Sequence, residues 1–441
     1  MSNPQQIEKG VDITNFEHKD LEQTKVEIKQ ETDTPEIVDN RPKKSNRLVS
    51  LDVCRGFTII FMILVNYQIE PFPILEHPEW FGFTLADVIF PNFVFIMGLA
   101  IPLAMAANRG QLQGVKLWIK VFKRFVLIFF IGLWVNLFPF SSPDFPRVLR
   151  IPGVLQRLAL CYFVLTILYI TCYQEKNRFQ YLYLRYGFPL SALLLWLGLT
   201  YGVNVPGEGC GRGVLTPECS TQSYLDTHIF GRNHTYQNMP YDPEGSLSTV
   251  TACISCWIGM MIGIDVVKYR NEFTEKQFRY KRVCHYSMIG LIGVLLGIFI
   301  NTGIPIGKPL WTPTFVLLAG GVSILLLVSF IFLIDIEDLL QSPIKPVAKL
   351  FEMFVVVGKN PLFLYVLSEN IASIFSAIPV HYSGRMSTNG MSNLFNLIYR
   401  VVFASWLPAH LASLTWSLFW ALLVYVPVAY LMDYKKWYVK L

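Results

Sequence analysis

Long apolar runs separated by short polar segments are the dominant pattern along this chain. Most of them are close to twenty residues, the length that an α-helix needs to cross the hydrocarbon core of a bilayer. Barrel strands would be about half as long and would alternate apolar with polar positions, so helices are favoured. We predict an all-α polytopic membrane protein of about ten transmembrane helices. The runs lie at 51–67, 85–106, 118–138, 153–172, 184–203, 248–266, 286–302, 312–335, 354–378 and 411–432.

Composition agrees with this pattern and sets the first segment apart. Apolar residues make up 53% of the 441 residues and charged residues only 15%, which is too apolar for a soluble domain. Residues 1–46 are instead polar, acidic and poor in aromatics, so we expect a disordered tail there and a membrane domain over 47–441. The expected surroundings of that domain are the lipid bilayer, and no nucleic acid is expected among its partners.

The distribution of basic residues predicts the orientation of the helices. If the runs cross the membrane alternately, most Lys and Arg residues fall in connections on the side of the N-terminus. Because basic loops stay in the cytosol, both termini are predicted to be cytosolic. The connection at about 204–245 then faces the lumen or the exterior.

This outer connection contains two features that depend on the compartment. Cys210 and Cys219 bracket a Gly- and Pro-containing loop and could form a disulfide in an oxidising space. Asn233 begins the sequence Asn-His-Thr, an N-glycosylation sequon on the correct side if the organism glycosylates. Cys253 and Cys256 are better explained by packing inside a span, and the cysteines lack zinc-site spacing, so no metal is expected.

Three polar residues gather near the outer mouth of the first two runs. Asn66 ends the first run, His77 lies in the Pro-rich connection, and Asp87 begins the second run. A histidine there could act as a general base, with Asp87 fixing its tautomer and Asn66 donating to developing negative charge. The pattern alone favours a more ordinary alternative, in which His77 is a solvated loop residue and Asn66 caps the helix.

Basic and amide groups on the inner side suggest a second site. Arg55 follows Asp52 by three residues and could pair with it. Most lysines beside spans are only topology signals, but a guanidinium inside a span needs an anion, carbonyls or a wet cavity. A cytosolic vestibule of such groups would suit a phosphate-bearing ligand. The candidates for this site are Arg55, Lys123, Arg124, Arg157 and Asn360.

Six sequence blocks, in order, resemble the heparan-alpha-glucosaminide N-acetyltransferase family, a group of transmembrane acyltransferases. The resemblance covers residues 47 to about 370 and is far more specific than any single motif. The blocks are RLVSLDVCRGFTIIFMILVNY, EHPEWFGFTLADVIFPNFVFIMG, RIPGVLQRLALCYF, YDPEGSLST, IPIGKPLWTPTFVL and GKNPLFLYV.

The resemblance implies an enzyme that takes acetyl-CoA from the cytosol and acetylates the amine of a terminal glucosamine on the lumenal side. It implies that His77 is catalytic, that Asn66 takes part, and that the Cys210 to Cys219 loop belongs to the lumenal insertion. It also suggests a homodimer. Transfer directly in a ternary complex and transfer through an acetylated His77 both remain open.

At two places the sequence differs from the family pattern, and both differences bear on which acceptor the protein would acetylate. The chain shows a short charged tail where the animal lysosomal enzyme has a lumenal domain and an extra span, and residues 68–70 read Gln-Ile-Glu where the family has glycines. An O-acyl or other-amine acyltransferase of the same fold is the alternative function, and a small-solute transporter is a more distant one. Expected locations are a lysosomal, vacuolar or other endomembrane in a eukaryote, and otherwise the plasma (inner) membrane.

Overall fold

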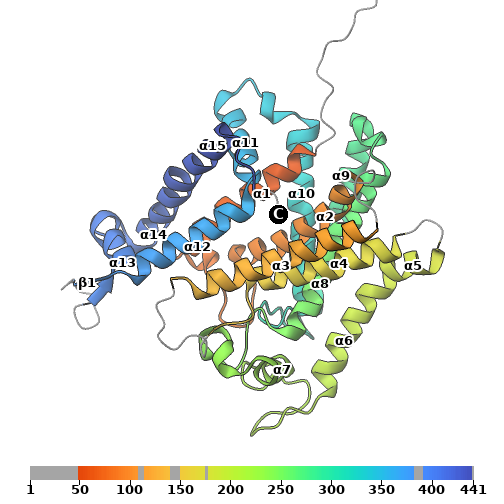
Figure 1. Ribbon diagram of the computed structural model, residues 1–441, viewed down its shortest axis with the longest axis horizontal. Helices are drawn as coiled ribbons and strands as arrows, with labels where there is room; N and C mark the ends of the chain where they lie inside the picture. Colours follow the sequence, from red (N-terminus) through yellow and green to blue (C-terminus); the bar gives the residue numbers. More distant parts are fainter. Residues whose placement is uncertain (1–47, 108–113, 140–148, 174–176, 382–390, 440–441) are drawn as a thin grey trace, which may run out of the picture. The chain divides into compact units, whose positions relative to one another are not determined.

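The computed structural model describes residues 48–107, 114–139, 149–173, 177–381 and 391–439. The tail predicted at 1–46 lies outside these residues. The described chain is mostly helical, with one short antiparallel pair of strands, β1 (Pro379–His381) and β2 (Met391–Asn393). The helices, shown in Figure 1, are α1 Val49–Asn66, α2 Ile89–Ala107, α3 Val115–Leu137, α4 Val154–Cys172, α5 Arg178–Leu182, α6 Phe188–Gly202, α7 Thr221–Phe230, α8 Ser246–Lys268, α9 Lys276–Ile300, α10 Pro313–Phe330, α11 Lys345–Gly358, α12 Pro361–Ala377, α13 Leu394–Ile398, α14 Ala409–Leu418 and α15 Val426–Tyr434.

The number of membrane-spanning helices is slightly lower than the predicted ten. Within the described residues, eight helices are long and apolar enough to cross a membrane, or nine if α11 and α12 count as one bent span. The all-α polytopic class is thus confirmed. The α3 helix has 23 residues, but four basic side chains in its first half lower its apolar character; these are Lys116, Lys120, Lys123 and Arg124.

Glycines let two pairs of helices approach each other at backbone distance. A Cβ on Gly98 of α2 would overlap the carbonyl oxygen of Cys256 in α8, and one on Gly259 would overlap that of Phe95. A Cβ on Gly56 of α1 would likewise meet the backbone of α11. Small residues are the usual means of close helix packing in lipid, where apolar burial gives little driving force. The α3 and α4 helices also run side by side (Figure 1).

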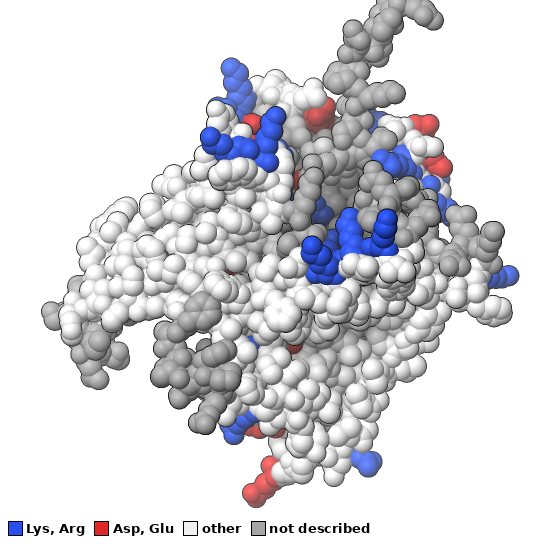
Figure 2. Space-filling model, in the orientation of Figure 1, with Lys and Arg blue, Asp and Glu red and all other residues white. Residues whose placement is uncertain are grey.

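Contacts between connections agree with helices that alternate in direction. Gly82 donates to the carbonyl of Ile306, and Ile151 donates to the carbonyl of His234, so connections predicted on the outer side meet one another. On the opposite side, Lys276 lies 3.8 Å from Glu337. Most of the face seen in Figure 2 is uncharged, and its basic side chains gather in a few groups, as expected for a protein with a lipid-facing surface.

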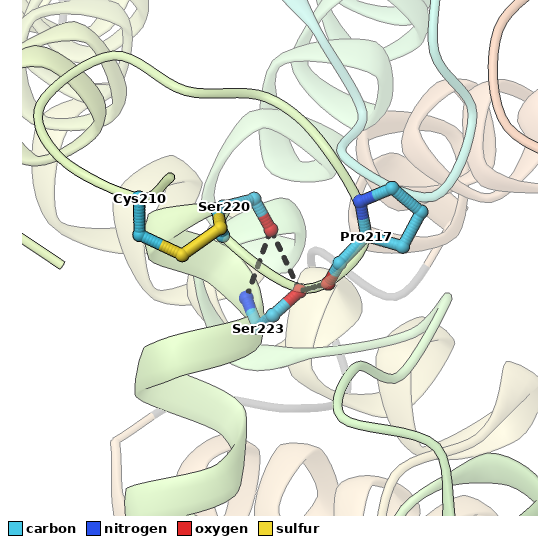
Figure 3. The surroundings of a disulfide bond; sticks show 5 residues. Cys210, Pro217, Ser220 and Ser223 are labelled. Atoms are coloured by element: carbon cyan, nitrogen blue, oxygen red, sulfur yellow. Dashed lines mark hydrogen bonds between the residues drawn. A yellow bond between two sulfur atoms is a disulfide. The ribbon is translucent and has the colours of Figure 1, made fainter. Parts of the chain in front are cut away.

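The outer connection before α8 contains the predicted disulfide between Cys210 and Cys219 (Figure 3). The disulfide ring ends at Cys219, just before α7. Ser220 caps the first turn of α7, because its hydroxyl accepts from the backbone N–H of Ser223. Ser223 in turn donates to the carbonyl of Pro217 inside the ring. The ring and α7 therefore form one hydrogen-bonded unit. The Asn233 side chain, in the turn that follows, is exposed.

Candidate functional site

His77, Asp87 and Lys308 form a compact group at the outer ends of α2 and α10. The Nδ1 atom of His77 lies 2.8 Å from Oδ1 of Asp87, and the Nζ atom of Lys308 lies 3.1 Å from the same oxygen. The carboxylate is fully buried, whereas the His77 side chain is 44% exposed and that of Lys308 22%. A buried carboxylate is costly unless charges and hydrogen bonds compensate it, and Lys308 supplies the compensating charge.

Local backbone bonds hold Asp87 in place. The residue lies in a 3₁₀ turn, Leu85–Val88, that leads directly into α2. The backbone N–H of Thr84 donates to Oδ2 of Asp87 at 3.2 Å, and the N–H of Asp87 donates back to the Thr84 carbonyl. A carboxylate at this end of a helix is also favoured by the helix dipole. One carboxylate oxygen of Asp87 is therefore hydrogen-bonded to the backbone, and the other faces His77 and Lys308.

Lys308 is held by the connection between α9 and α10. The Gly82 bond to Ile306 joins this connection to the His77 loop at 2.8 Å. Trp311 is fully buried and has a left-handed φ of 47°, and its backbone N–H donates to the Lys308 carbonyl. The Thr312 hydroxyl accepts from the N–H of Gly307 and caps α10. Lys308 is thus bracketed by fixed residues on both sides.

The His77 loop is also fixed to the large outer connection. The Trp80 indole N–H donates to the carbonyl of Leu215 at 2.7 Å, and its ring meets Tyr241 edge to face at 4.7 Å between centroids. The Thr84 hydroxyl donates to the Glu76 carbonyl at 2.8 Å. These contacts lie on both sides of His77 along the chain. The histidine is therefore held on a loop fixed by hydrogen bonds, and its side chain is partly exposed.

This geometry selects one tautomer of His77. An ionised carboxylate only accepts hydrogen bonds, so Nδ1 carries the proton and donates it to Asp87. Nε2 then has a lone pair that can accept a proton from a ligand. A neutral imidazole oriented in this way is a suitable general base or nucleophile. The predicted pairing of His77 with Asp87 is present, whereas the contribution of Lys308 was not predicted.

Asn66 lies against a different helix. Its amide donates to Oε1 of Glu369 in α12 at 3.1 Å, and the next residue, Tyr67, donates its hydroxyl to the Ser368 carbonyl. The hydrogen bonds that His77 makes with described side chains go to Asp87 and Lys308. The structure therefore joins Asn66 to α12 and does not join it to His77 by a hydrogen bond. Glu369 was not singled out from the sequence.

A second charged cluster lies in the outer connections. Arg150 donates to both carboxylate oxygens of Asp242, at 2.9 and 2.7 Å, and to Glu244. Burial opposes the charge of Arg150, but these two carboxylates outweigh it and raise the pKa of the guanidinium. Arg150 begins the RIPGVLQRLALCYF block, but it was not singled out as a site residue, because its partners lie more than ninety residues away. Asp242 and Glu244 belong to the YDPEG block.

Arg157 lies beside this cluster and not with the other predicted cations. It is fully buried near the start of α4, where it donates to the Pro243 carbonyl at 2.8 Å and stacks 4.9 Å from the Trp311 ring. Its Nη1 atom has no hydrogen-bond partner among the described residues. Since Pro243 belongs to the connection assigned to the outer side, Arg157 lies toward that end of α4.

The remaining predicted binding residues are dispersed. Arg55 pairs with Asp52 at 3.3 Å, as expected from their spacing. Arg124 stacks over Tyr162 of α4 at 4.6 Å, while Lys123 is exposed one residue earlier. Asn360 uses both ends of its amide on the C-terminal segment, donating to the Trp437 carbonyl and accepting from the Val439 N–H. Asn360 therefore fastens the bend between α11 and α12 to the end of the chain.

Comparisons with known proteins show a distant relationship to one group of enzymes. A family model described as "Domain of unknown function (DUF5009)" matches residues 47–202. Heparan-alpha-glucosaminide N-acetyltransferase of Mus musculus is 30% identical over 377 residues, which are 76% of this chain and 55% of that protein. The protein of that name from Homo sapiens is 30% identical over 372 residues, 75% of this chain and 54% of its own length. The chain thus spans about half the length of the curated relatives it matches. It is distantly related to heparan-alpha-glucosaminide N-acetyltransferase.

Proposed function

We propose that this chain is a membrane-bound acetyltransferase that uses acetyl-CoA from one side of the membrane to acetylate an amine on the other. The observation that carries the proposal is the His77–Asp87 pair at 2.8 Å, half open at the outer mouth. The names of the relatives supply the class of reaction. The acceptor proposed is the amine of a terminal glucosamine-type sugar, and no metal is needed.

His77 has a defined role in this proposal. An amine attacks a thioester only when it is unprotonated, so a base must hold or remove its proton. Nε2 of His77 can do this, while Asp87 holds Nδ1 and keeps the ring oriented. Such base assistance typically increases a rate by about 10²- to 10⁴-fold. The same Nε2 atom could instead accept the acetyl group before the amine does; accumulation of an acetylated enzyme in rapid-quench experiments distinguishes that route.

The donor is proposed to enter from the side on which α3 begins. Lys123 is exposed there, and Arg124 lies one residue deeper against α4. Arg55, near the start of α1, is half-buried and paired with Asp52, and it is proposed as a separate contact for the donor. Ammonium and guanidinium groups suit the phosphates of CoA, so neutralising Lys123 or Arg124 is expected to raise the KM for acetyl-CoA. Arg157 is proposed to act deeper along α4, near the acetyl end.

The acceptor is proposed to lie between the His77 loop and the large outer connection. Trp80 and Tyr241 present aromatic surfaces there, and Glu244 supplies a carboxylate nearby in the chain. We propose that this side is lumenal, in a lysosomal or other endomembrane, and that Asn233 is glycosylated. The resemblance to this family also motivates the proposal of a homodimer.

The test uses the full chain purified and reconstituted in vesicles, with labelled acetyl-CoA and glucosamine. The wild type is expected to acetylate glucosamine, and His77→Ala to lose at least about 10²-fold in rate. His228→Ala is the matched control, because His228 is an exposed histidine of the outer connection that bonds only to its own helix, at the Tyr224 carbonyl. Full activity of a folded His77→Ala protein would contradict the proposal.

A further inference from the structure

The position of the Lys308 ammonium relative to the His77 ring is unusual. Its Nζ atom lies 3.2 Å from Nδ1 and 3.5 Å from Nε2. A donor in the ring plane, on the lone pair of Nδ1, would be much farther from Nε2 than from Nδ1, because that lone pair points away from the ring. The ammonium therefore does not lie on that lone pair, and it is within hydrogen-bond distance of both ring nitrogens.

This placement leaves the Nδ1 proton to Asp87, to which Nδ1 donates at 2.8 Å. The ammonium lies 3.5 Å from Nε2, the ring nitrogen that would act as the base. The ammonium has three donors and gives one to Asp87 at 3.1 Å. Its other protons lie beside the place where a group bonded to Nε2 would sit. Lys308 is 22% exposed, so this place can be reached from outside.

We propose that Lys308 is a catalytic residue that stabilises the oxyanion formed from the thioester carbonyl. The inference rests on the proposed acetyl transfer. Asn66, the residue considered for this role from the sequence, donates instead to Glu369 at 3.1 Å. Lys308 is the donor that lies beside His77. A charged donor facing a full negative charge also forms a stronger hydrogen bond than an amide does.

The proposed transfer accounts for each electron pair and each proton. The amine nitrogen forms a bond to the thioester carbon, the π pair of the carbonyl moves onto oxygen, and Nε2 of His77 takes one amine proton. When the intermediate collapses, the oxygen pair re-forms the carbonyl, the carbon–sulfur bond breaks, and the sulfur takes the proton back from His77. The oxyanion is separated from the attacking nitrogen only by the thioester carbon. It therefore forms close to Nε2, within reach of the ammonium.

Kinetics of Lys308→Met provide the first test. This variant keeps the stem and removes the charge, and kcat for acetyl transfer to glucosamine is expected to fall about 10²- to 10³-fold with an unchanged KM for acetyl-CoA. Lys308→Gln keeps a donor for Asp87 and covers the case in which the Met variant does not fold; it should lose most of the rate as well. Lys308→Arg should recover part of it. Lys276→Met, which removes an exposed lysine beside Glu337, is the control.

Ligand affinity provides a second readout that a merely structural role would not change. Two non-reacting CoA analogues are compared: a trifluoromethyl ketone, whose hydrate resembles the tetrahedral intermediate, and a thioether without a carbonyl. The wild type is expected to bind the ketone more tightly, and Lys308→Met to lose that preference while its affinity for the thioether is unchanged.

The outcomes separate the two proposals. If the wild type transfers no acetyl group to any amine, the proposed function fails, and the ketone preference still tests Lys308. If the wild type is active and Lys308→Met keeps its kcat, or if both analogues lose affinity equally, the inference about Lys308 is overturned.

Discussion

Asp87 is the residue on which the geometry of the outer site depends. One of its oxygens is bonded to the N–H of Thr84, and the other meets both His77 and Lys308. Removing its charge would leave the ammonium without its buried partner and would let the imidazole turn or change tautomer. A single carboxylate thus controls the orientation of two candidate catalytic groups.

Asp87→Asn is therefore expected to reduce acetyl transfer by about 10²- to 10⁴-fold, with little change in acetyl-CoA affinity. The measurement is kcat and KM on the reconstituted protein, beside Asp338→Asn as a control in the connection between α10 and α11. An Asp87→Asn protein with wild-type kcat would show that His77 needs no carboxylate.

Asp226 in α7 gives the outer connection a pH dependence. Burial raises the pKa of this carboxyl to about 6, although the Ser246 N–H and hydroxyl both donate to it. Between about pH 4 and pH 6, the folded chain holds a proton that the unfolded chain has lost. Stability is therefore fully present below pH 4 and falls as the pH rises, by about 3 kcal/mol in total.

The detergent-solubilised protein is thus expected to have a lower Tm at pH 7.5 than at pH 5. Asp226→Asn, which cannot titrate but can still accept from Ser246, should lose most of this difference. The measurement is thermal unfolding of both proteins across this pH range. An equal pH dependence in the two proteins would exclude Asp226 as its source.

Residues near in sequence were easier to predict at this scale than distant ones. His77 and Asp87 are ten residues apart, and both flank the same turn, so their meeting follows from the chain direction. Lys308 is 231 residues from His77 and appears in the sequence only as one outer cation among several. Likewise, no local pattern indicates that Asn66 contacts Glu369 or that Asn360 holds residues 437–439, because both contacts depend on tertiary packing.

Among the helices, the α2–α8 pair is one whose close contact leaves no room for added volume. Gly259→Ala would push a methyl group into the carbonyl of Phe95, and such overpacking typically costs about 1–3 kcal/mol. Gly198→Ala in α6 is the matched control, since nothing lies within 4 Å of its added Cβ. There the better helix propensity of alanine should stabilise by up to about 1 kcal/mol.

We expect Tm to fall for Gly259→Ala and to stay level or rise for Gly198→Ala, as measured by thermal unfolding in detergent. Because α2 begins at the Asp87 turn and α8 begins beside Arg157, a shift between these helices would also lower activity. Equal Tm values for the two variants would mean that the α2–α8 contact adapts without cost.

Helix positions could be predicted from the length and place of the apolar runs, whereas breaks within helices could not. The run at 354–378 reads as one span, yet α11 and α12 meet at an angle of 82° beside Lys359, Asn360 and Pro361. Proline disfavours helical geometry in the residue before it, which marks a possible break there. The size of the bend depends on partners such as Asp433, which binds Lys359 at 2.7 Å.

For the whole molecule, the arrangement of connections gives a test of sidedness. Asn233 is exposed in the connection assigned to the outer side. Expressed in a eukaryotic cell, the chain is expected to carry a glycan that glycosidase removes and that is absent from Asn233→Gln. Digestion of intact vesicles shows on which side the glycan lies. Where the glycan is accessible, a tag on the N-terminus should be protected, and where the glycan is protected, the tag should be accessible. If both sites are accessible from the same side, the predicted orientation is wrong.

The disulfide links the histidine to the redox state of its surroundings. The ring closed by Cys210 and Cys219 contains Leu215, whose carbonyl holds Trp80, three residues after His77. Opening the ring would free the backbone that fixes this loop, so Cys210→Ser is expected to lower kcat even with His77, Asp87 and Lys308 intact. Addition of dithiothreitol to the wild type checks the same point without mutation. A chain inserted in the membrane but still reduced would then be an immature enzyme, and oxidative folding would be the step that switches it on.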